Sequence, residues 1–332
     1  MKNTKALALT VALAGLVSTA ALAAGIDDPA RAPYYAAFDG KTVAFVPQGM
    51  GYDLTEGWAA GLKKYLAPLG VKIEIRDPNY NTDAGAQAIT ELIQQKPDAI
   101  VVQNPDVQSY SKLLKKANEA GIYVIQVNMR STYTSDSFVG ADYVGMGEVL
   151  ANRMIDKCSP ANGGNGKISI TQGVITAAAS ALQMKGIDNV LSKHPEMKVV
   201  SSQAADWDAT KARSIMATVL QSNPDLCAAA GFWDVMDVGT AAAIREAKKN
   251  VYVITEGGGN QAACDNLNNG SFDEVIVFDV PEQSRDITDM LKSLFQNKPP
   301  AGSTHTTLFT PLKYFTKDTL KPGACWAFEA KK

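Results

Sequence analysis

Short, continuously apolar runs alternate with helix-length segments along most of this chain. In its first half, strands are predicted at residues 43–46, 71–75, 99–102 and 123–127, of which 43–46 and 99–102 are continuously apolar, and segments with helical spacing of apolar residues lie at 58–66, 84–95 and 109–120. A continuously apolar run is typical of a strand buried on both faces of a parallel sheet. Because strands and helices that alternate in this way form right-handed βαβ units, the first half predicts one doubly wound lobe.

A second series of the same kind follows residue 145. Strands are predicted at residues 167–171, 198–201, 228–232, 251–255 and 275–278, with helices at 145–156, 177–191, 209–221, 235–248, 262–268 and 282–296. The stretch 139–145 separates the two series and is predicted to be a crossing between two lobes. The length of 332 residues agrees with this division, since it is too great for one core and suits two domains of roughly 150 residues each.

The first residues have the pattern of an export signal. A short basic region, residues 1–5, precedes an apolar run that ends in Ala21-Leu22-Ala23, a small-x-small cleavage site. We therefore expect residues 1–23 to be a signal peptide, and the mature protein to be exported and soluble. Residues 24–40 show no periodicity and are expected to form an extended arm.

Export changes how the four cysteines are interpreted. Cys158, Cys227, Cys264 and Cys325 have no C-x-x-C spacing, and the chain has only two histidines, so neither a metal site nor a redox motif is predicted. An even number of cysteines in an oxidising compartment favours disulfides. Of the three possible pairings, we favour Cys158 with Cys227 and Cys264 with Cys325, because Cys158 and Cys227 each adjoin a predicted strand.

In open α/β sheets, ligands bind beyond the carboxyl ends of the strands, so the residues after each predicted strand are the candidates for a binding site. In the first lobe these are Gln48, Tyr52, Asp53, Asn104, Asn128 and Arg130, and in the second lobe they are Trp207, Trp233, Asp234, Glu256 and Asp279, with Asp142 between the lobes. Amides and carboxylates can exchange hydrogen bonds with hydroxyl groups, and aromatic rings can stack on C–H faces.

Several of these candidates have a structural alternative. Asp53, Asp142 and Asp234 stand where a helix N-cap would, the two tryptophans can belong to a core, and Arg130 can be an exposed loop residue. These alternatives stay open at the level of sequence.

Motifs of catalysis are missing from the sequence. It contains no G-x-S-x-G, H-E-x-x-H or Walker motif, and Gly257-Gly258-Gly259 is more typical of a turn than of a phosphate site. The net charge of -2, without a basic patch that includes aromatic residues, gives no indication of nucleic-acid binding. We therefore expect a protein that binds a polar molecule, uses no cofactor or metal, and is not an enzyme.

In sequence, the chain resembles the ribose-type, cluster B periplasmic solute-binding proteins of ABC transporters. The segments that carry the resemblance are 42–46 with Gly61, Asn104-Pro105, 120–125, 139–142, Gln172-Gly173, 185–187, 205–208, Asp234 with Gly239, and 267–270. The resemblance implies the type I periplasmic binding protein fold, in which two doubly wound parallel-sheet lobes are joined by a three-crossover hinge. The crossings are implied near residues 141–142, 279–280 and Leu308, so that 24–141 and 280–307 form the N-terminal lobe, and 142–279 and 308–332 form the C-terminal lobe.

The resemblance also implies a pocket and a function. The implied pocket positions are Gln48, Tyr52, Leu54, Thr55, Asn128, Met129, Ala181, Trp207, Trp233, Gly257 or Gly258, and Asp279. Asn128-Met129 and Ala181 stand where ribose binders commonly have cationic side chains, which favours a neutral or cationic ligand over an acidic one.

We therefore expect a periplasmic, monomeric protein that binds a sugar, a sugar alcohol or a related small polar ligand and delivers it to a membrane permease. A sensory protein that presents its ligand to a chemoreceptor or sensor kinase, a binder of a small nitrogenous ligand, and an exported enzyme remain alternatives.

Overall fold

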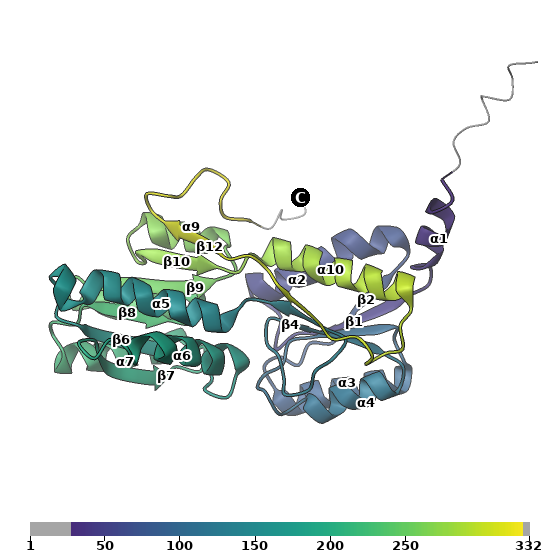
Figure 1. The fold of residues 1–332 in the computed structure, drawn as a ribbon, viewed down its shortest axis with the longest axis horizontal. Coiled ribbons are helices and arrows are strands. Elements are labelled where there is room, and N and C mark those ends of the chain that lie inside the picture. The colour runs from purple at the N-terminus through teal and green to yellow at the C-terminus, as the bar shows by residue number, and fades with distance from the viewer. Residues whose placement is uncertain (1–27, 328–332) are drawn as a thin grey trace, which may run out of the picture.

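The computed structural model describes residues 28–327, so the predicted signal peptide, residues 1–23, lies outside the described residues. Within that range the chain forms two lobes, each built on a sheet of six strands (Figure 1). The first sheet has the order β11-β5-β4-β3-β1-β2, and all of its pairings are parallel. Its strands are β1 (Thr42–Val46), β2 (Lys72–Ile75), β3 (Ala99–Val102), β4 (Tyr123–Val127), β5 (Ser137–Gly140) and β11 (Thr306–Phe309).

Helices cover both faces of this first sheet. The helices that cover it are α2 (Asp53–Leu66), α3 (Thr82–Gln95), α4 (Ser111–Glu119) and α10 (Val280–Asn297), with a short 3-10 turn at Ala67–Leu69; the short helix α1 (Arg31–Ala36) has no buried residue. Helices α2 and α10 lie on one side of the sheet, and α3 and α4 lie on the other (Figure 1). Val43 and Phe45 of β1 pack toward Trp58 of α2, whereas Ala44 and Val46 pack toward Ile89 of α3. This alternation buries every second residue on each face, as expected for a doubly wound lobe.

The second lobe repeats the strand order of the first. Its sheet is β12-β10-β9-β8-β6-β7, in which only the edge strand β12 is antiparallel to its neighbour. The strands are β6 (Lys167–Gln172), β7 (Lys198–Ala204), β8 (Ala228–Gly231), β9 (Tyr252–Gly257), β10 (Glu274–Val277) and β12 (Lys313–Thr316). The helices are α5 (Tyr143–Cys158), α6 (Ala178–Leu191), α7 (Ala209–Ser222), α8 (Asp234–Glu246) and α9 (Gln261–Asn268), with a 3-10 turn at Pro160–Asn162. The predicted fold class is confirmed.

The chain passes between the two sheets three times. It passes from β5 to α5 at Ala141 and Asp142, from β10 to α10 at Phe278 and Asp279, and from β11 to β12 at residues 310–312. Leu308, which the resemblance places near the third crossing, lies inside β11, so that crossing begins two residues later. Asp279 forms an ion pair with Lys313, and this pair ties the second crossing to the third.

Four short elements differ from the prediction: one helix in place of an extended arm, and three strands that were not predicted. The expected extended arm is wrong over Arg31–Ala36, which form helix α1, and buried Phe38 follows this helix and packs its ring on Tyr34 and Phe295. The strands β5, β11 and β12 were not predicted. Each has only four residues, and β11 and β12 are largely exposed, so they lack the continuously apolar run that identifies a buried strand.

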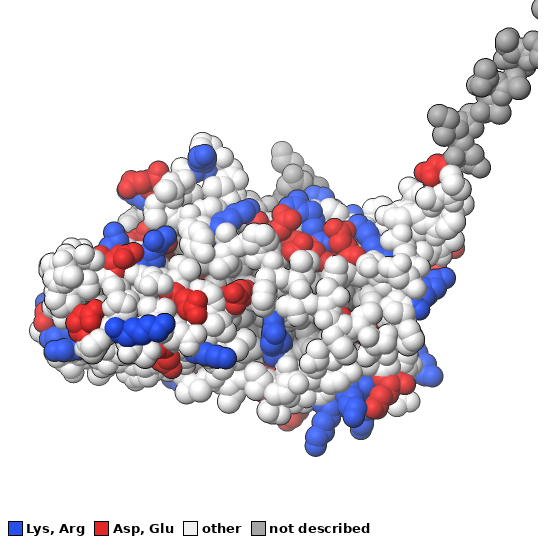
Figure 2. All heavy atoms as spheres, viewed as in Figure 1, with Lys and Arg blue, Asp and Glu red and all other residues white. Residues whose placement is uncertain are grey.

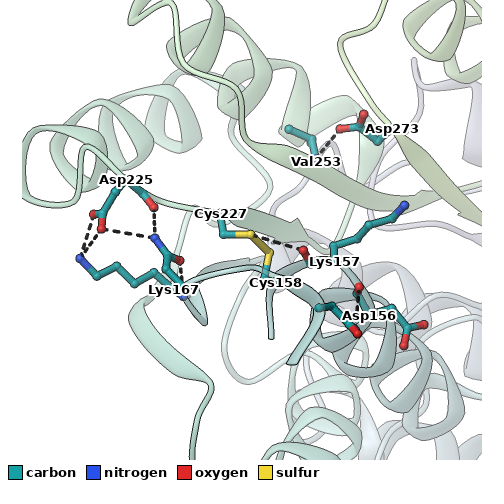
Figure 3. Close-up of a disulfide and its surroundings, with 10 residues drawn as sticks. Asp156, Lys157, Cys158, Lys167, Asp225, Cys227, Val253 and Asp273 are labelled. Atoms are coloured by element: carbon teal, nitrogen blue, oxygen red, sulfur yellow. Dashed lines mark hydrogen bonds and ion pairs between the residues drawn. A yellow bond between two sulfur atoms is a disulfide. The ribbon is translucent and has the colours of Figure 1, made fainter. Parts of the chain in front are cut away.

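Both predicted disulfides are confirmed, and both lie in the second lobe. Cys158, the last residue of α5, is bonded to Cys227 at the entrance to β8, and Cys264 of α9 is bonded to Cys325. Figure 3 shows the first bond beside Lys167, whose Nζ lies 2.8 Å from both carboxylate oxygens of Asp225. This bond joins a helix on one face of the sheet to a central strand.

The surface carries charges of both signs. On the face shown in Figure 2, Lys and Arg side chains are interspersed with Asp and Glu, without a large region of one sign. None of the helices between residues 28 and 327 combines the length and the apolar character needed to cross a membrane.

The Cys158–Cys227 bond closes a loop with a sequence separation of 69 residues. Replacing both cysteines by serine should lower the free energy of unfolding by about 2–4 kcal/mol, because the unfolded chain regains the entropy that the crosslink removes. Guanidinium unfolding followed by circular dichroism measures the change. A double variant that unfolds at the denaturant concentration of the parent would contradict this role, and the parent under reducing conditions serves as the comparison in which both bonds are open.

Candidate ligand-binding site

A cavity lies between the two lobes, at the carboxyl ends of their strands. The space between its side chains is about 510 Å³, open solvent included. Its lining consists of Gln48, Tyr52, Leu54, Thr55, Tyr80, Gln103, Asn128, Met129, Tyr143, Ala179, Trp207, Phe232, Trp233, Glu256 and Phe278. Both lobes contribute, so a molecule in this cavity would touch both.

Four aromatic rings form one side of the cavity. The ring of Tyr52 lies 5.7 Å from that of Tyr80 and 5.2 Å from that of Trp233, and the rings of Trp233 and Trp207 are 6.3 Å apart. Each pair is edge-to-face, with interplanar angles between 66° and 86°. The rings therefore form an uninterrupted apolar surface that extends from the first lobe to the second.

A glycine supports one of these rings in each lobe in the same way. The ring of Tyr80, after β2, lies against Gly49, after β1, and the ring of Trp207, after β7, lies against Gly173, after β6. A Cβ atom at Gly49 would meet the Tyr80 ring at 2.3 Å, and one at Gly173 would meet the Trp207 ring at 2.0 Å. Only glycine leaves this space.

Left-handed backbone geometry also recurs around the cavity. Tyr80 has φ 62°, Trp207 has φ 66° and Asn128 has φ 58°. Residues other than glycine rarely adopt such positive φ values. Such conformations persist only where the surrounding structure holds them, and they are often found at binding sites.

Amide side chains form the first-lobe part of the polar wall. Gln48 donates from Nε2 to the carbonyl of Asn104 at 2.8 Å, and its backbone N–H donates to Oε1 of Gln103 at 3.2 Å. Asn128 accepts from Nε2 of Gln283 at 3.4 Å, and Gln283 in turn accepts from the indole of Trp58 at 3.1 Å. This chain of buried polar groups holds the Asn128 side chain in place at the cavity.

Three buried carboxyl groups lie on the second-lobe side. Burial raises the pKa of Glu256 well above its usual value, although a hydrogen bond from Gln183 opposes this shift. Burial also raises the pKa of Asp234 and that of Asp237 to about 7. Of the three, only Glu256 lines the cavity.

Six of the twelve predicted residues line the cavity: Gln48, Tyr52, Asn128, Trp207, Trp233 and Glu256. Two more, Asp53 and Asp234, line a smaller neighbouring cavity that they share with Tyr52 and Trp233.

The other four predicted residues do not line the cavity, and each makes contacts within the protein instead. Asn104 is buried and donates to Gln126 and to the carbonyl of Met129. The guanidinium of Arg130 stacks on Phe138, 4.0 Å from the ring centroid. Asp142 caps α5 through Gly145, and Asp279 caps α10 through Glu282. Ala181, which the resemblance implies, is exposed, and Ala179 lines the cavity instead.

Several lining residues were not among the predicted ones. Phe232 and Phe278 directly follow β8 and β10. The predicted strands 228–232 and 275–278 each end one residue too late, so both phenylalanines fall inside a predicted strand and not beyond its carboxyl end. Tyr80 lies five residues beyond β2, too far from the strand end for the rule of strand ends to identify it. Nothing in the local pattern of the sequence identifies Tyr143, the first residue of α5.

The lobes contact each other on more than one side of the cavity. Asn260 Nδ2 of the second lobe donates to Asp53 Oδ2 of the first at 2.6 Å, and the backbone N–H of Val107 donates to the carbonyl of Thr176 at 3.1 Å. Trp326 donates from its indole N–H to the carbonyl of Gly258, and its ring approaches Gly57 of α2. The structure is therefore a closed arrangement of the lobes.

Among residues 28–327, no group of three or more His, Cys, Asp or Glu side chains is placed to hold a metal ion.

Known proteins show the same architecture. A family model described as periplasmic binding protein domain matches residues 43–299. The ribose import binding protein of Bacillus subtilis is 29% identical over 203 residues, which are 61% of this chain and 65% of that protein. The xylitol-binding protein of Mycolicibacterium smegmatis is 27% identical over 264 residues, which are 79% of this chain and 73% of that protein.

Solved structures agree in fold. An ABC transporter solute-binding protein from Burkholderia graminis, in complex with D-arabinose, superposes with a TM-score of 0.74 at 22% identity, covering 85% of this chain and 96% of the other. A galactofuranose-binding protein superposes with a TM-score of 0.73 at 19% identity, covering 84% and 95%. With its family match over most of its length and this shared two-lobed fold, the chain belongs to the periplasmic binding protein domain family.

Proposed function

We propose that this protein is the solute-binding component of an ABC importer and that it binds a sugar, a sugar alcohol or a related small polar ligand between its lobes. The observation that carries the proposal is the cavity itself, which is lined by strand ends of both lobes and closed by contacts between them. A ligand that touches both lobes stabilises their closed arrangement over an open one.

The lining supports a neutral ligand with both polar and C–H surfaces. Among the described residues that line the cavity there is no Lys, Arg or His, so an anionic group would have no cationic partner there. Trp207 and Trp233 would stack on C–H faces of the ligand, and Asn128, Gln48 and Tyr52 would exchange hydrogen bonds with its hydroxyl groups. Relatives named for ribose and xylitol support this ligand class.

Reversible binding, without turnover, is the activity that we propose. Among the described residues, the lining contains amide, aromatic and aliphatic side chains, the hydroxyl of Thr55 and the carboxyl group of Glu256. The Thr55 hydroxyl donates to the backbone carbonyl of Tyr52, so it is not paired with a base as a catalytic nucleophile would be.

The proposed cellular role follows from the family. We propose that residues 1–23 direct export, that the two lobes, divided at the three crossings described above, close against each other, and that the closed form is presented to a membrane permease in the periplasm. The names of relatives that are import binding proteins support this role.

A thermal-shift screen tests the proposal. The purified protein is heated with pentoses, hexoses, polyols, inositols and small nitrogenous compounds in turn. A ligand at a hundredfold excess over its Kd stabilises the folded state by about 2.7 kcal/mol, which raises the melting temperature. A rise with neutral carbohydrates is expected, whereas a rise only with amines would contradict the ligand class.

Trp233 contacts rings from both lobes, so its removal should weaken binding. Trp233→Ala should lower the affinity for the ligand found in the screen by roughly tenfold or more, the change that corresponds to about 1.4 kcal/mol. Isothermal titration calorimetry measures the affinity. Tyr314→Ala removes an exposed ring from β12 and is the control. Equal affinities for Trp233→Ala and the parent would exclude the stacking role.

The hydrogen bond between Asp53 and Asn260 should slow the release of the ligand, because it forms only when the lobes are closed. Asp53→Ala should raise the dissociation rate several-fold, as expected for loss of about 1 kcal/mol, with a smaller effect on association. Stopped-flow tryptophan fluorescence measures both rates. Glu91→Ala, which removes an exposed carboxylate from α3, should leave them unchanged. If Asp53→Ala changed only the association rate, the hydrogen bond between Asp53 and Asn260 would not stabilise the closed form.

A further inference from the structure

Among the described residues, Glu256 carries the one carboxyl group that lines the cavity, and one of its two oxygens has no hydrogen-bond partner. Gln183 Nε2 donates to Glu256 Oε1 at 2.8 Å. The other oxygen, Oε2, is buried and has no hydrogen-bond partner within the protein, and only 2% of the residue is exposed. An unpaired buried polar atom costs stability, so a ligand that hydrogen-bonds to Oε2 removes that cost.

The groups around Glu256 disfavour a negative charge on it. Asp234 and Asp237 of α8 are the neighbouring carboxyl groups, and both raise its pKa in addition to the larger effect of burial. Tyr143 of α5 faces Glu256 from another side, and Asp53 of α2 faces Asp234. No cationic side chain is found among the described residues that line the cavity.

Gln183 also determines which oxygen of Glu256 carries the proton. Its amide N–H is a donor, so Oε1 must accept, and a proton on the carboxyl group then lies on Oε2. Oε2 is therefore the atom that can donate.

We propose that Glu256 determines ligand specificity by donating a hydrogen bond from Oε2 to an oxygen of a neutral polyhydroxy ligand. Ligands with an acidic group are disfavoured for a separate reason, since the described lining offers them no cationic partner. This inference rests on the proposed binding of a sugar or polyol. It differs from recognition by an ionised carboxylate, in which Glu256 would accept hydrogen bonds from the ligand or pair with its ammonium group.

The two modes predict opposite dependence on pH. If the ligand binds the protonated group, affinity is constant at acidic pH and falls by about tenfold per unit once the pH exceeds the raised pKa. If it binds the ionised group, affinity rises with pH up to that pKa. Asp234 and Asp237 also titrate near neutral pH, so Asp237→Asn is needed as a control that changes the cluster without changing the lining of the cavity.

Two substitutions of Glu256 distinguish the modes directly. Glu256→Gln keeps an oxygen that accepts from Gln183 and places an amide N–H where Oε2 stands, so it should keep the affinity for neutral sugars within about threefold and abolish the fall at high pH. Glu256→Met has a similar shape and no donor, and it should lower the affinity by roughly tenfold. Calorimetric titrations with D-ribose, D-arabinose, D-galactose and xylitol measure these effects, with D-galacturonate and D-galactosamine as charged counterparts of D-galactose.

Neutral probes should bind, D-galacturonate should not, and Glu256→Gln should behave as the parent does at acidic pH. A loss of tenfold or more in folded Glu256→Gln, an affinity that rises with pH, or binding of D-galactosamine alone among the probes would overturn the proposed role of Glu256. If no probe bound, the proposed binding function would fail together with this inference, whereas failure of Glu256→Gln alone would leave binding of the neutral sugar intact.

Discussion

The cavity depends on one constraint, which is that parallel βαβ winding places all carboxyl strand ends of a sheet at one edge. Each lobe repeats the same strand order, and three crossings hold the two edges opposite each other. Ion pairing of Asp279 with Lys313 joins two of these crossings. This arrangement explains the position of the side chains that line the cavity, because each lies at or near the end of a strand or helix that faces the other lobe.

The two lobes also build their halves of the cavity in the same way. Tyr80 and Trp207 follow the second strand of their sheets and lie on a glycine that follows the first strand. The fourth strands differ, since the first lobe supplies the amide of Asn128 and the second supplies the carboxyl of Glu256. The shared part provides apolar surface, and the part that differs provides the polar groups on which specificity would depend.

Much of the fold could be predicted from the sequence, because buried parallel strands produce apolar runs that are visible without tertiary information. The strands β11 and β12 could not be predicted, since exposed edge strands of four residues have no such signal. The rule of strand ends found Trp207, Trp233, Asn128 and Glu256, but it could not separate cavity residues from caps such as Asp142. That distinction depends on the direction of the side chain, which tertiary packing determines.

The central claim is that a neutral ligand holds the two lobes together. Small-angle X-ray scattering of the protein, without ligand and then saturated with the best ligand from the thermal screen, tests this claim most directly. The account predicts a smaller radius of gyration with ligand and a curve that matches the closed structure. Identical scattering with and without a ligand that binds would contradict it.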